Sequence, residues 1–441
     1  MRADRMSPRR LSRGLLAAYG LAAFPLAILG LPLNVYLPAF WGETMGVGFA
    51  KVGAVLLATR LLDGMTDPLA GVLSDRTRSR FGRRRPWIAA GGLIAAPAVW
   101  LLFVPPPGAG ALHLFVCASL VYLGWTLINV PHSAWGAELS PDYDERVRIA
   151  AWREAATLAG IVSSALIPAL APGGLASDLR TLAVLTLVLA APAFLLLLLV
   201  VPEPPAPGRP PRRPLRETLV FLARNRPFLR LLAAWTTNGV ANGLPAALFL
   251  LVVTYLLRAE GQAGVLLLAY FLTGIAAVPF WTWLAARFSK HRAWSLAMLW
   301  ASAVFAVVPL LGPGDWVVFL IVCVLTGSAL GADLALPPAI QADVIDLDHL
   351  QGGNPRAGLF FAAWSMAQKA GNAIAVGLGL PLLEAFGFRT TEAGAEGLGA
   401  LVFLYAVAPI VLKVSVAALM WRFPIDREAQ HAIRARLEGR A

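Results

Sequence analysis

The stretch from Arg60 to Trp87 reads RLLDGMTDPLAGVLSDRTRSRFGRRRPW and joins two acids in an apolar run to a strongly basic turn. Asp63 and Asp67 stand four residues apart, so on a helix they project from one face, one turn apart. Counted back from Asp75 at about 1.5 Å per residue, Asp63 lies roughly 18 Å deep and Asp67 roughly 12 Å. That depth is near the middle of a bilayer, where a carboxylate must be paired, protonated or bound to a cation. The two acids are therefore predicted to form a functional site.

The composition of the chain places it in a membrane. Of its 441 residues, 58% are hydrophobic and 14% are charged, and the mean hydropathy is +0.69. A soluble globular protein is far less apolar. The formal net charge of +12 is confined to short segments between apolar runs, which indicates orientation in a membrane rather than binding to nucleic acid. Both cysteines fall in hydrophobic segments, so a disulfide framework is not expected.

Apolar runs of about 20 residues, the length that crosses the hydrocarbon core, recur along the whole chain. They lie near 14–40, 49–74, 87–104, 112–136, 149–171, 181–201, 229–257, 262–285, 293–311, 316–343, 357–383 and 398–421. The first run follows a basic N-terminus without a clear small-residue cleavage site, so we expect it to be a retained span. The pattern predicts an all-α membrane protein with twelve transmembrane helices.

The runs divide the chain into two halves. We expect an N-terminal six-helix half (1–201), a cytoplasmic linker rich in proline and arginine (202–228), a C-terminal six-helix half (229–421) and a cytoplasmic tail (422–441). A weak repeat relates the halves, because GVLSDRTRSRFGRRRPW after the second run is echoed by TWLAARFSKHRAW after the eighth. Two such halves around a site near the midplane form the major facilitator architecture.

Basic residues mark one side of the predicted membrane protein. Thirty of the 37 Lys and Arg residues lie in the two termini and the even-numbered connections, against three (Arg180, Arg258, Arg389) on the other side. The positive-inside rule then puts both termini in the cytoplasm. We expect an integral protein of a bacterial inner membrane.

Three stretches resemble the glycoside–pentoside–hexuronide:cation symporters, the melibiose-permease family of the major facilitator superfamily. They are RLLDGMTDPLAGVLSDRTRSRFGRRRPW (60–87), NVPHSAWGAELSPDYDERVRIAAWRE (129–154) and PPAIQADVIDLDHLQGGNPRAGLFFAAWSMAQKAGNA (337–373). The resemblance covers the whole chain. It implies the major facilitator fold, with twelve transmembrane helices in two pseudo-symmetric six-helix halves.

The resemblance implies a site for the coupling cation. In that family the matching acids of the second helix bind the cation, which gives this role to Asp63 and Asp67, with Thr126 of the fourth helix at a contributing position. Two carboxylates and a hydroxyl supply hard oxygen ligands suited to Na⁺, and either acid can instead hold a proton. The chemistry of the site leaves Na⁺ and H⁺ open, and no other cofactor is expected.

Two buried cations also match the family. Lys369 matches its lysine on the eleventh helix and Arg153 its arginine on the fifth. Lys369 lies about twelve residues into its run, too deep to reach the interface, so it should seek an acid. Asp63 or Asp67 is the expected partner. Arg60 shares the face of these acids, and we expect it either to hold them as a counter-ion or to take part directly.

The solute side of the resemblance is weaker. The fourth-helix acid expected to hold a sugar is Asn129 here, and the first run, AAYGLAAFPLAILG, has no acid. Asn129 still offers hydrogen bonds to a hydroxyl group, and Trp125, one turn away, offers a surface for stacking on a sugar. Asp333 lies roughly 15 Å from the inner end of its run. Its alternatives are a role in substrate or proton binding and a structural contact with a neighbouring helix.

Charged residues at the cytoplasmic ends of the runs are predicted to gate the transporter. They are Asp75, Arg76 and Arg83 in the first half and Asp343 and Arg356 in the second. A gating network of salt bridges is the favoured interpretation, and a solvated charge run is the alternative.

These features predict a secondary active transporter that couples Na⁺ or H⁺ to the symport of a sugar, a glycoside or a related small solute. The alternative is an amphipathic solute such as a lysolipid or a terpenoid glycoside, because the sugar-binding acids are missing. A membrane scaffold on a transporter fold is a third reading. An enzyme is not expected, because the chain has no phosphate-binding loop motif and no paired Cys/His metal motif. The expected partners are a small solute, a monovalent cation and membrane lipid, with no nucleic acid, and the chain is expected to be a monomer.

Overall fold

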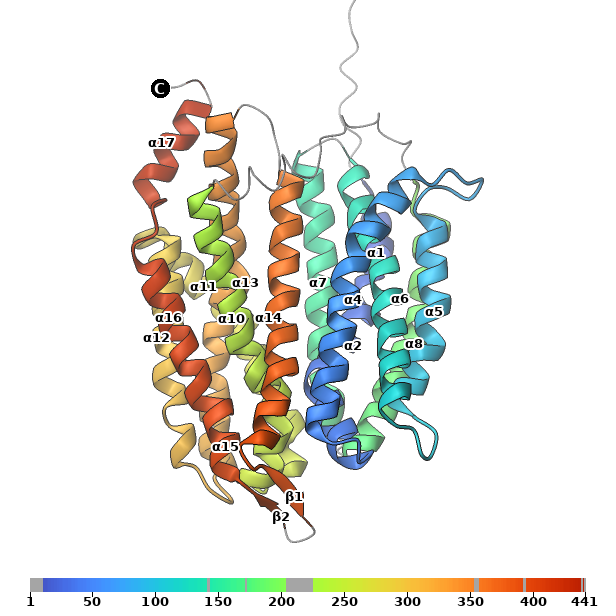
Figure 1. Cartoon of the computed structure of the whole chain (residues 1–441). Helices are drawn as coiled ribbons and strands as arrows, with labels where there is room; N and C mark the ends of the chain where they lie inside the picture. The colour runs from blue at the N-terminus through green and yellow to red at the C-terminus, as the bar shows by residue number, and fades with distance from the viewer. Residues whose placement is uncertain are drawn as a thin grey trace, which may run out of the picture. The chain divides into compact units, whose positions relative to one another are not determined.

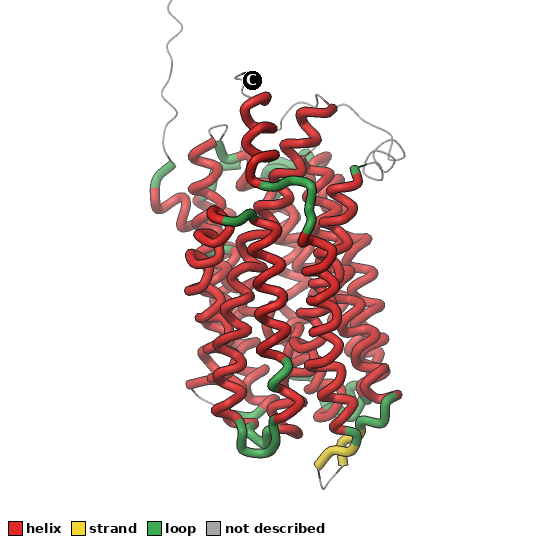
Figure 2. Tube along the Cα trace, turned by 90° about the vertical axis from the view of Figure 1, so that its left-hand side faces the viewer, coloured by secondary structure: helices red, strands yellow, loops and turns green. Residues whose placement is uncertain are grey.

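The computed structural model describes residues 11–140, 143–170, 173–203, 225–352, 357–391, 394–437 and 439. Within them the chain is nearly all helical, and its strands are confined to one short hairpin (Figure 2). Nine helical segments of this described part are long and apolar enough to cross a membrane. The prediction of an all-α membrane protein is confirmed.

The elements follow one another in the order drawn in Figure 1. Up to the undescribed stretch 204–224 they are α1 (Arg13–Gly20), α2 (Ala23–Leu31), η1 (Pro32–Tyr36), α3 (Leu37–Ala39), η2 (Phe40–Thr44), α4 (Phe49–Arg76), α5 (Arg85–Phe103), α6 (Ala111–Glu138), α7 (Tyr143–Leu170) and α8 (Leu175–Val200). After it come α10 (Arg226–Leu251), η3 (Val252–Leu256), η4 (Glu260–Gln262), α11 (Ala263–Arg287), α12 (Lys290–Phe305), η5 (Val308–Leu310), α13 (Trp316–Gly352), α14 (Ala357–Ala385), β1 (Arg389–Thr391), β2 (Gly394–Glu396), α15 (Leu398–Val402), η6 (Phe403–Val407), α16 (Ala408–Trp421) and α17 (Arg427–Leu437).

Three further long helices, α4, α7 and α14, are not among the nine apolar segments. They have 28, 28 and 29 residues, which at about 1.5 Å per residue is ample to cross a bilayer. Polar residues lower their hydropathy, and these include the predicted site residues Asp63, Arg153 and Lys369. Three of the predicted site residues therefore lie on long helices outside the nine apolar segments, and these three helices together with the nine segments are consistent with the twelve predicted runs.

The chain forms two compact units. The first comprises Met1–Phe40 and Ala58–Arg209, and the second comprises Trp41–Leu57 and Pro210–Ala441. The boundary falls inside α4, whose residues 49–57 belong to the second unit; there the backbone N–H of Ala50 donates to Glu384 Oε2 at 2.8 Å. Of the predicted linker 202–228, residues 204–224 lie outside the described part of the chain.

Glycines bring the helices of the first unit into backbone contact. A Cβ added at Gly160 of α7 would lie 2.5 Å from the carbonyl oxygen of Phe24 in α2. A Cβ at Gly124 of α6 would lie 2.8 Å from the carbonyl oxygen of Gly91 in α5. Small residues at such crossings let membrane helices pack closely, which fixes the positions of α6 and α7 within this unit.

The second unit is built around aromatic side chains. Phe228 and Phe360 pack edge to face with ring centres 4.5 Å apart, and Trp235 stacks on Trp364 at 4.5 Å. Trp294 is fully buried in the same apolar cluster. Helix α17 and the β1–β2 hairpin lie at opposite ends of this unit (Figure 1).

Candidate cation-binding site

Asp63 and Asp67 meet Thr126 in the first unit, as the sequence predicts. The Thr126 hydroxyl oxygen lies 2.9 Å from Asp63 Oδ1 and 2.7 Å from Asp67 Oδ1. Asp63 is 4% exposed and Thr126 is 1% exposed. The two acids come from successive turns of α4 and the hydroxyl comes from α6, so the site joins two helices of one unit.

The Thr126 hydroxyl has one proton but two carboxylate neighbours. It can donate to both carboxylates only by sharing that one proton between them. Two oxygen atoms at hydrogen-bond distance repel each other unless a proton or a cation lies between them. The second contact is stable when one acid is protonated or when a cation bridges the oxygens. The arrangement is chemically suited to hold one monovalent cation or one proton.

Arg60 is held beside this site by two neighbours. Its Nη2 donates to Asn34 Oδ1 at 2.9 Å, and its guanidinium carbon lies 4.2 Å from the centre of the Tyr122 ring. Tyr122 precedes Thr126 by one turn of α6. Both predicted roles of Arg60, as a counter-ion and as a direct participant, stay predictions.

Helix α6 carries a polar stripe that joins the cation site to Arg153. Tyr122, Thr126, Asn129 and Ser133 are spaced at i, i+4, i+7 and i+11, which puts them on one helix face. Ser133 Oγ accepts a hydrogen bond from Arg153 Nη1 at 2.9 Å. Asn129 lies between Thr126 and Ser133 on this stripe, and its side chain is exposed.

Trp125 differs from these stripe residues in its surroundings. It is half-buried and packs against the apolar cluster around Tyr19 and Trp135. Its predicted stacking on a solute stays a prediction.

The basic turn after α4 forms an ion-pair network at the end of the first unit. Arg84 Nη2 lies 2.9 Å from Asp75 Oδ1 and 2.7 Å from Glu138 Oε1, and Arg83 also pairs with Glu138. Glu203 accepts from the backbone N–H groups of Arg83 and Arg84 at 2.7 and 2.6 Å. Burial acts to lower the pKa of Arg84, but its bonds to Glu138 and Asp75 outweigh this and raise the pKa.

Not every predicted gating residue of the first unit joins this network. Asp75 and Arg83 do, whereas Arg76 lies exposed at the end of α4. Arg84, Glu138 and Glu203 were missed. The run of three arginines in the turn was the only local signal for Arg84.

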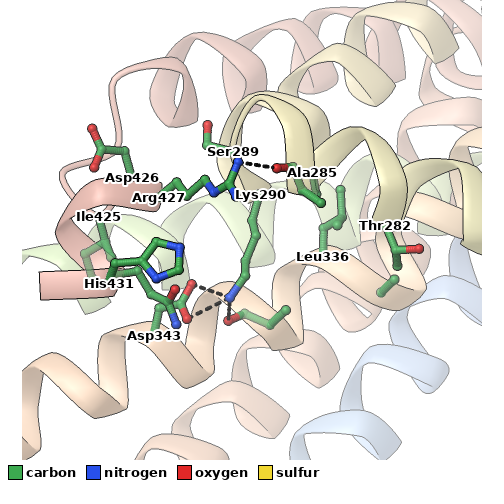
Figure 3. Close-up of a pocket in the computed structure, with 14 residues that line it drawn as sticks. Thr282, Ala285, Ser289, Lys290, Leu336, Asp343, Ile425, Asp426, Arg427 and His431 are labelled. Atoms are coloured by element: carbon green, nitrogen blue, oxygen red, sulfur yellow. Dashed lines mark hydrogen bonds and ion pairs between the residues drawn. The ribbon is translucent and has the colours of Figure 1, made fainter. Parts of the chain in front are cut away.

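In the second unit, Asp343 pairs with a residue that the sequence reasoning did not select. Lys290 Nζ lies 2.7 Å from both Asp343 carboxylate oxygens. The pair lines a cavity of about 280 Å³ under α17, with His431 beside it (Figure 3). Lys290 lies in the echoed repeat, at the turn after α11. Arg356 lies outside the described residues.

Comparison with known proteins identifies the family. The family model described as MFS/sugar transport protein matches residues 18–427. The chain belongs to this family of major facilitator proteins. The predicted resemblance is confirmed, and the family is one of transporters rather than enzymes.

Relatives and a solved structure agree with this placement. An uncharacterized symporter of Synechocystis is 27% identical, and the match covers 96% of both chains. The sodium-dependent lysophosphatidylcholine symporter 1 of the mouse is 26% identical over 96% of this chain and 87% of that protein. The crystal structure of the nucleoside transporter NupG superposes with a TM-score of 0.66, at 13% identity, over 92% of this chain and all of that one. The last of these shows the fold alone.

Two predicted site residues of this major facilitator protein lie in the second unit. Asp333 is 7% exposed, and its oxygens accept from Asn242 Nδ2 at 2.9 Å and Trp294 Nε1 at 2.7 Å. Lys369 lies half-buried on α14. Since Asp63 and Asp67 belong to the first unit, the expected pairing of Lys369 with these acids stays a prediction.

Proposed function

We propose that this chain is a secondary active symporter in which one monovalent cation, bound by Asp63, Asp67 and Thr126, drives the movement of a small solute by alternating access. The single Thr126 hydroxyl between two acids carries the proposal, because a bound cation or an added proton would stabilise three oxygen atoms that otherwise share one hydroxyl proton. Cation and solute then each bind more tightly when the other is present, as linkage demands.

Na⁺ is the first candidate for the coupling ion. The oxygen donors suit it, and the mouse relative is named as sodium-dependent. H⁺ is the alternative, because one proton on either acid satisfies the Thr126 hydroxyl equally well. Uptake under an imposed Na⁺ gradient and under an imposed pH gradient distinguishes the two ions.

A sugar, a glycoside or a related small hydroxylated solute is the first candidate for the cargo. The family description names sugar transport. Asn129 supports this cargo, because it is exposed on the α6 face that carries Thr126 at one side and the Arg153 contact at the other. A solute bound at Asn129 would lie within one or two helix turns of the cation site. At that distance a bound solute and a bound cation could affect each other's affinity through the residues of α6.

A lysolipid is the second candidate for the cargo. The mouse relative is named as a lysophosphatidylcholine symporter. The first predicted span, residues 14–40, also contains no acidic residue to bind the hydroxyl groups of a sugar. An amphipathic solute needs fewer polar partners along its tail than a sugar needs around its ring.

The membrane setting is part of the proposal. The distribution of Lys and Arg supports an orientation with both termini in the cytoplasm. We infer a monomer in a bacterial inner membrane, built from two six-helix halves (1–201 and 229–421) joined by 202–228. Lys369 would stand in for the cation at Asp63 and Asp67 when the site is empty. The Arg84 and Lys290 networks would open and close the cytoplasmic side.

Uptake by proteoliposomes tests the function. Purified protein is given radiolabelled methyl glycosides, a hexuronide and lysophosphatidylcholine under an imposed Na⁺ gradient, an imposed pH gradient or neither. Accumulation of one solute above its outside concentration under one gradient supports symport and identifies cation and cargo together. Equal uptake with and without both gradients, for every solute, contradicts cation coupling.

A further inference from the structure

A second buried charge network lies in the second unit, apart from the elements that build the cation site. Lys413 of α16 is 6% exposed and Asp333 of α13 is 7% exposed. Lys413 lies eight residues before the end of α16, roughly 12 Å, so neither group is at the surface of its helix bundle. Buried ionisable groups at such depth are costly and mark functional sites by default.

The two charges are joined through an amide rather than in direct contact. Asn242 of α10 donates from Nδ2 to Asp333 Oδ2 at 2.9 Å and accepts at Oδ1 from Lys413 Nζ at 2.7 Å. Separation by an amide weakens the attraction between the charges, while both still bear the cost of leaving water. A purely structural pair would gain more from direct contact. The spacing therefore points to a role other than stability.

The surroundings of Lys413 suit both of its protonation states. Its Nζ donates to Asn242 Oδ1 and, at 3.3 Å, to Asn238 Oδ1, and its third neighbour is the Met298 sulfur at 3.7 Å. An ammonium has three N–H donors and here finds two oxygen acceptors and one weak sulfur acceptor. A neutral amine has two N–H donors, which the same two oxygens satisfy. The group can gain or lose a proton without rearrangement of its neighbours.

The hydrogen bonds of Asp333 suit a carboxylate that balances a positive charge on Lys413. Its two oxygens accept from Asn242 and from Trp294 of α12, donors that cannot accept a proton in return. Both carboxylate oxygens are therefore occupied as acceptors, and the charge of Asp333 lies on the far side of Asn242 from Lys413, where it can balance a proton on the amine. Among the described residues, Tyr270 of α11 also interacts electrostatically with Asp333, and Tyr270 in turn interacts with Cys323 of α13. From α10 and α12, the neutral side chains of Asn238, Asn242, Trp294 and Met298 contact Asp333 or Lys413.

One hydrogen-bond donor beside Lys413, the side-chain amide of Asn238, has no acceptor among the described residues. Asn238 is 1% exposed, its Oδ1 faces Lys413, and its Nδ2 has no hydrogen-bond partner among the described residues. A buried amide hydrogen without an acceptor is costly and calls for a ligand atom such as a water oxygen. Water at that point would connect Lys413 to a source of protons.

We propose that Lys413, held by Asn238 and Asn242 and balanced by Asp333, is a proton-binding site separate from Asp63, Asp67 and Thr126. The neutral amine takes a proton from water on its nitrogen lone pair. In the reverse step an N–H bond breaks, the electron pair stays on nitrogen and the proton returns to water. The proton site itself does not depend on the proposed symport. Its consequence rests on that function: transport gains a proton-dependent step in addition to cation binding at α4.

The low lysine content of the chain makes the site directly observable. The sequence has four lysines, Lys51, Lys290, Lys369 and Lys413. In protein labelled with ¹³Cε,¹⁵Nζ-lysine and held in lipid nanodiscs, NMR resolves each lysine side chain. The signal that disappears in Lys413→Gln is assigned to Lys413. This measurement needs no solute, so its failure is distinct from failure of the proposed symport.

The signal of Lys413 is followed across a pH titration, from about pH 6 to 9, in wild type and two variants. We expect its chemical shift to change across the titration as the amine exchanges its proton with water. Asp333→Asn removes the balancing charge and should lower the protonated fraction at any given pH. Thr326→Ala is the control, because it deletes another buried polar group of α13, one that bonds to Val322 O, and it should leave the curve in place. A Lys413 shift that is constant across the titration, or the same curve in Asp333→Asn, overturns the inference.

A second measurement keeps the test open if Asp333→Asn alone unfolds the protein. Asp333→Asn with Lys413→Gln leaves a neutral pair of similar size. We expect this double variant to accumulate solute less well than wild type and to lose the part of the pH dependence of uptake that wild type shows. A double variant with the pH profile of wild type overturns the inference while leaving the proposed symport intact.

Discussion

Thr126 has a single hydroxyl proton and two acidic neighbours, at 2.9 and 2.7 Å. Thr126→Ser keeps the hydroxyl and should keep cation affinity within about threefold. Thr126→Val keeps the shape and removes the hydroxyl. Because a hydrogen bond to a charged group contributes about 1.5–3 kcal/mol, cation affinity should fall roughly 10- to 100-fold. The Na⁺ concentration dependence of uptake measures both. Equal curves for the two variants would show that the hydroxyl is not a ligand.

Asn129 is exposed on the same face of α6 as Thr126, so its loss should affect the solute more than the cation. We expect Asn129→Ala to raise the KM for a hydroxylated solute about tenfold, the effect of one lost hydrogen bond in a binding site. The Na⁺ dependence measured at saturating solute should stay near wild type. A variant with altered Na⁺ dependence and unaltered solute KM would assign Asn129 to the cation site instead.

At the scale of helices, Gly160 sets the distance between α7 and α2. Its Cα faces the Phe24 carbonyl so closely that a Cβ would lie 2.5 Å away, whereas a Cβ at Gly30 of α2 meets nothing within 4 Å. Gly160→Ala should destabilise the first unit by about 1–3 kcal/mol, the usual cost of overpacking. Gly30→Ala should be neutral. Thermal unfolding in detergent compares them, and equal melting temperatures would mean that α2 and α7 are not in backbone contact.

The ion-pair network around Arg84 joins α4, α5 and α6. Glu138→Gln should destabilise the protein by about 3–5 kcal/mol, because it leaves a guanidinium that is 2% exposed with one fewer partner. Arg76→Gln, on an exposed side chain, should cost less than about 0.5 kcal/mol. Chemical unfolding of the two variants checks the difference. A small effect of Glu138→Gln would show that Asp75 alone compensates Arg84.

The Arg84 network should not respond to pH near neutrality. The pKa of Arg84 is raised above its usual value, so the stability it contributes is fully present below the unfolded pKa and is lost only as pH rises through the folded one, in the strongly alkaline range. The difference between wild type and Glu138→Gln should therefore be constant between about pH 6 and 9. A difference that disappears within that range would point to a titrating partner of Arg84.

Local spacing predicted those parts of the site that lie within one helix. Asp63 and Asp67 are one turn apart in the sequence, and their depth in an apolar run is a sufficient signal. Thr126 came from family resemblance, since it lies 63 residues from Asp63. The partners of Lys413 and Asp343 were missed because Asn242 is 171 residues from Lys413 and Lys290 is 53 residues from Asp343. No local pattern encodes such pairs.

At the scale of the whole molecule, the proposed coupling must link Asp63 and Asp67 of the first unit to Lys369 of the second. If Lys369 replaces the cation when the site is empty, Lys369→Ala should leave two acids without this counter-charge and abolish accumulation against a gradient. Solute exchange between equal concentrations should be less affected. Wild-type accumulation by this variant would remove Lys369 from the coupling mechanism.

Gradient-driven uptake by Asp67→Asn tests whether the acid pair on α4 couples the cation to the solute. Wild-type protein and the variant are reconstituted in the same vesicles, and solute accumulation is measured with and without the driving gradient identified for wild type. We predict that the variant loses accumulation in response to that gradient while still exchanging solute at equal concentrations. Undiminished accumulation by Asp67→Asn, and by Asp63→Asn in the same assay, would contradict a coupling site at these carboxylates.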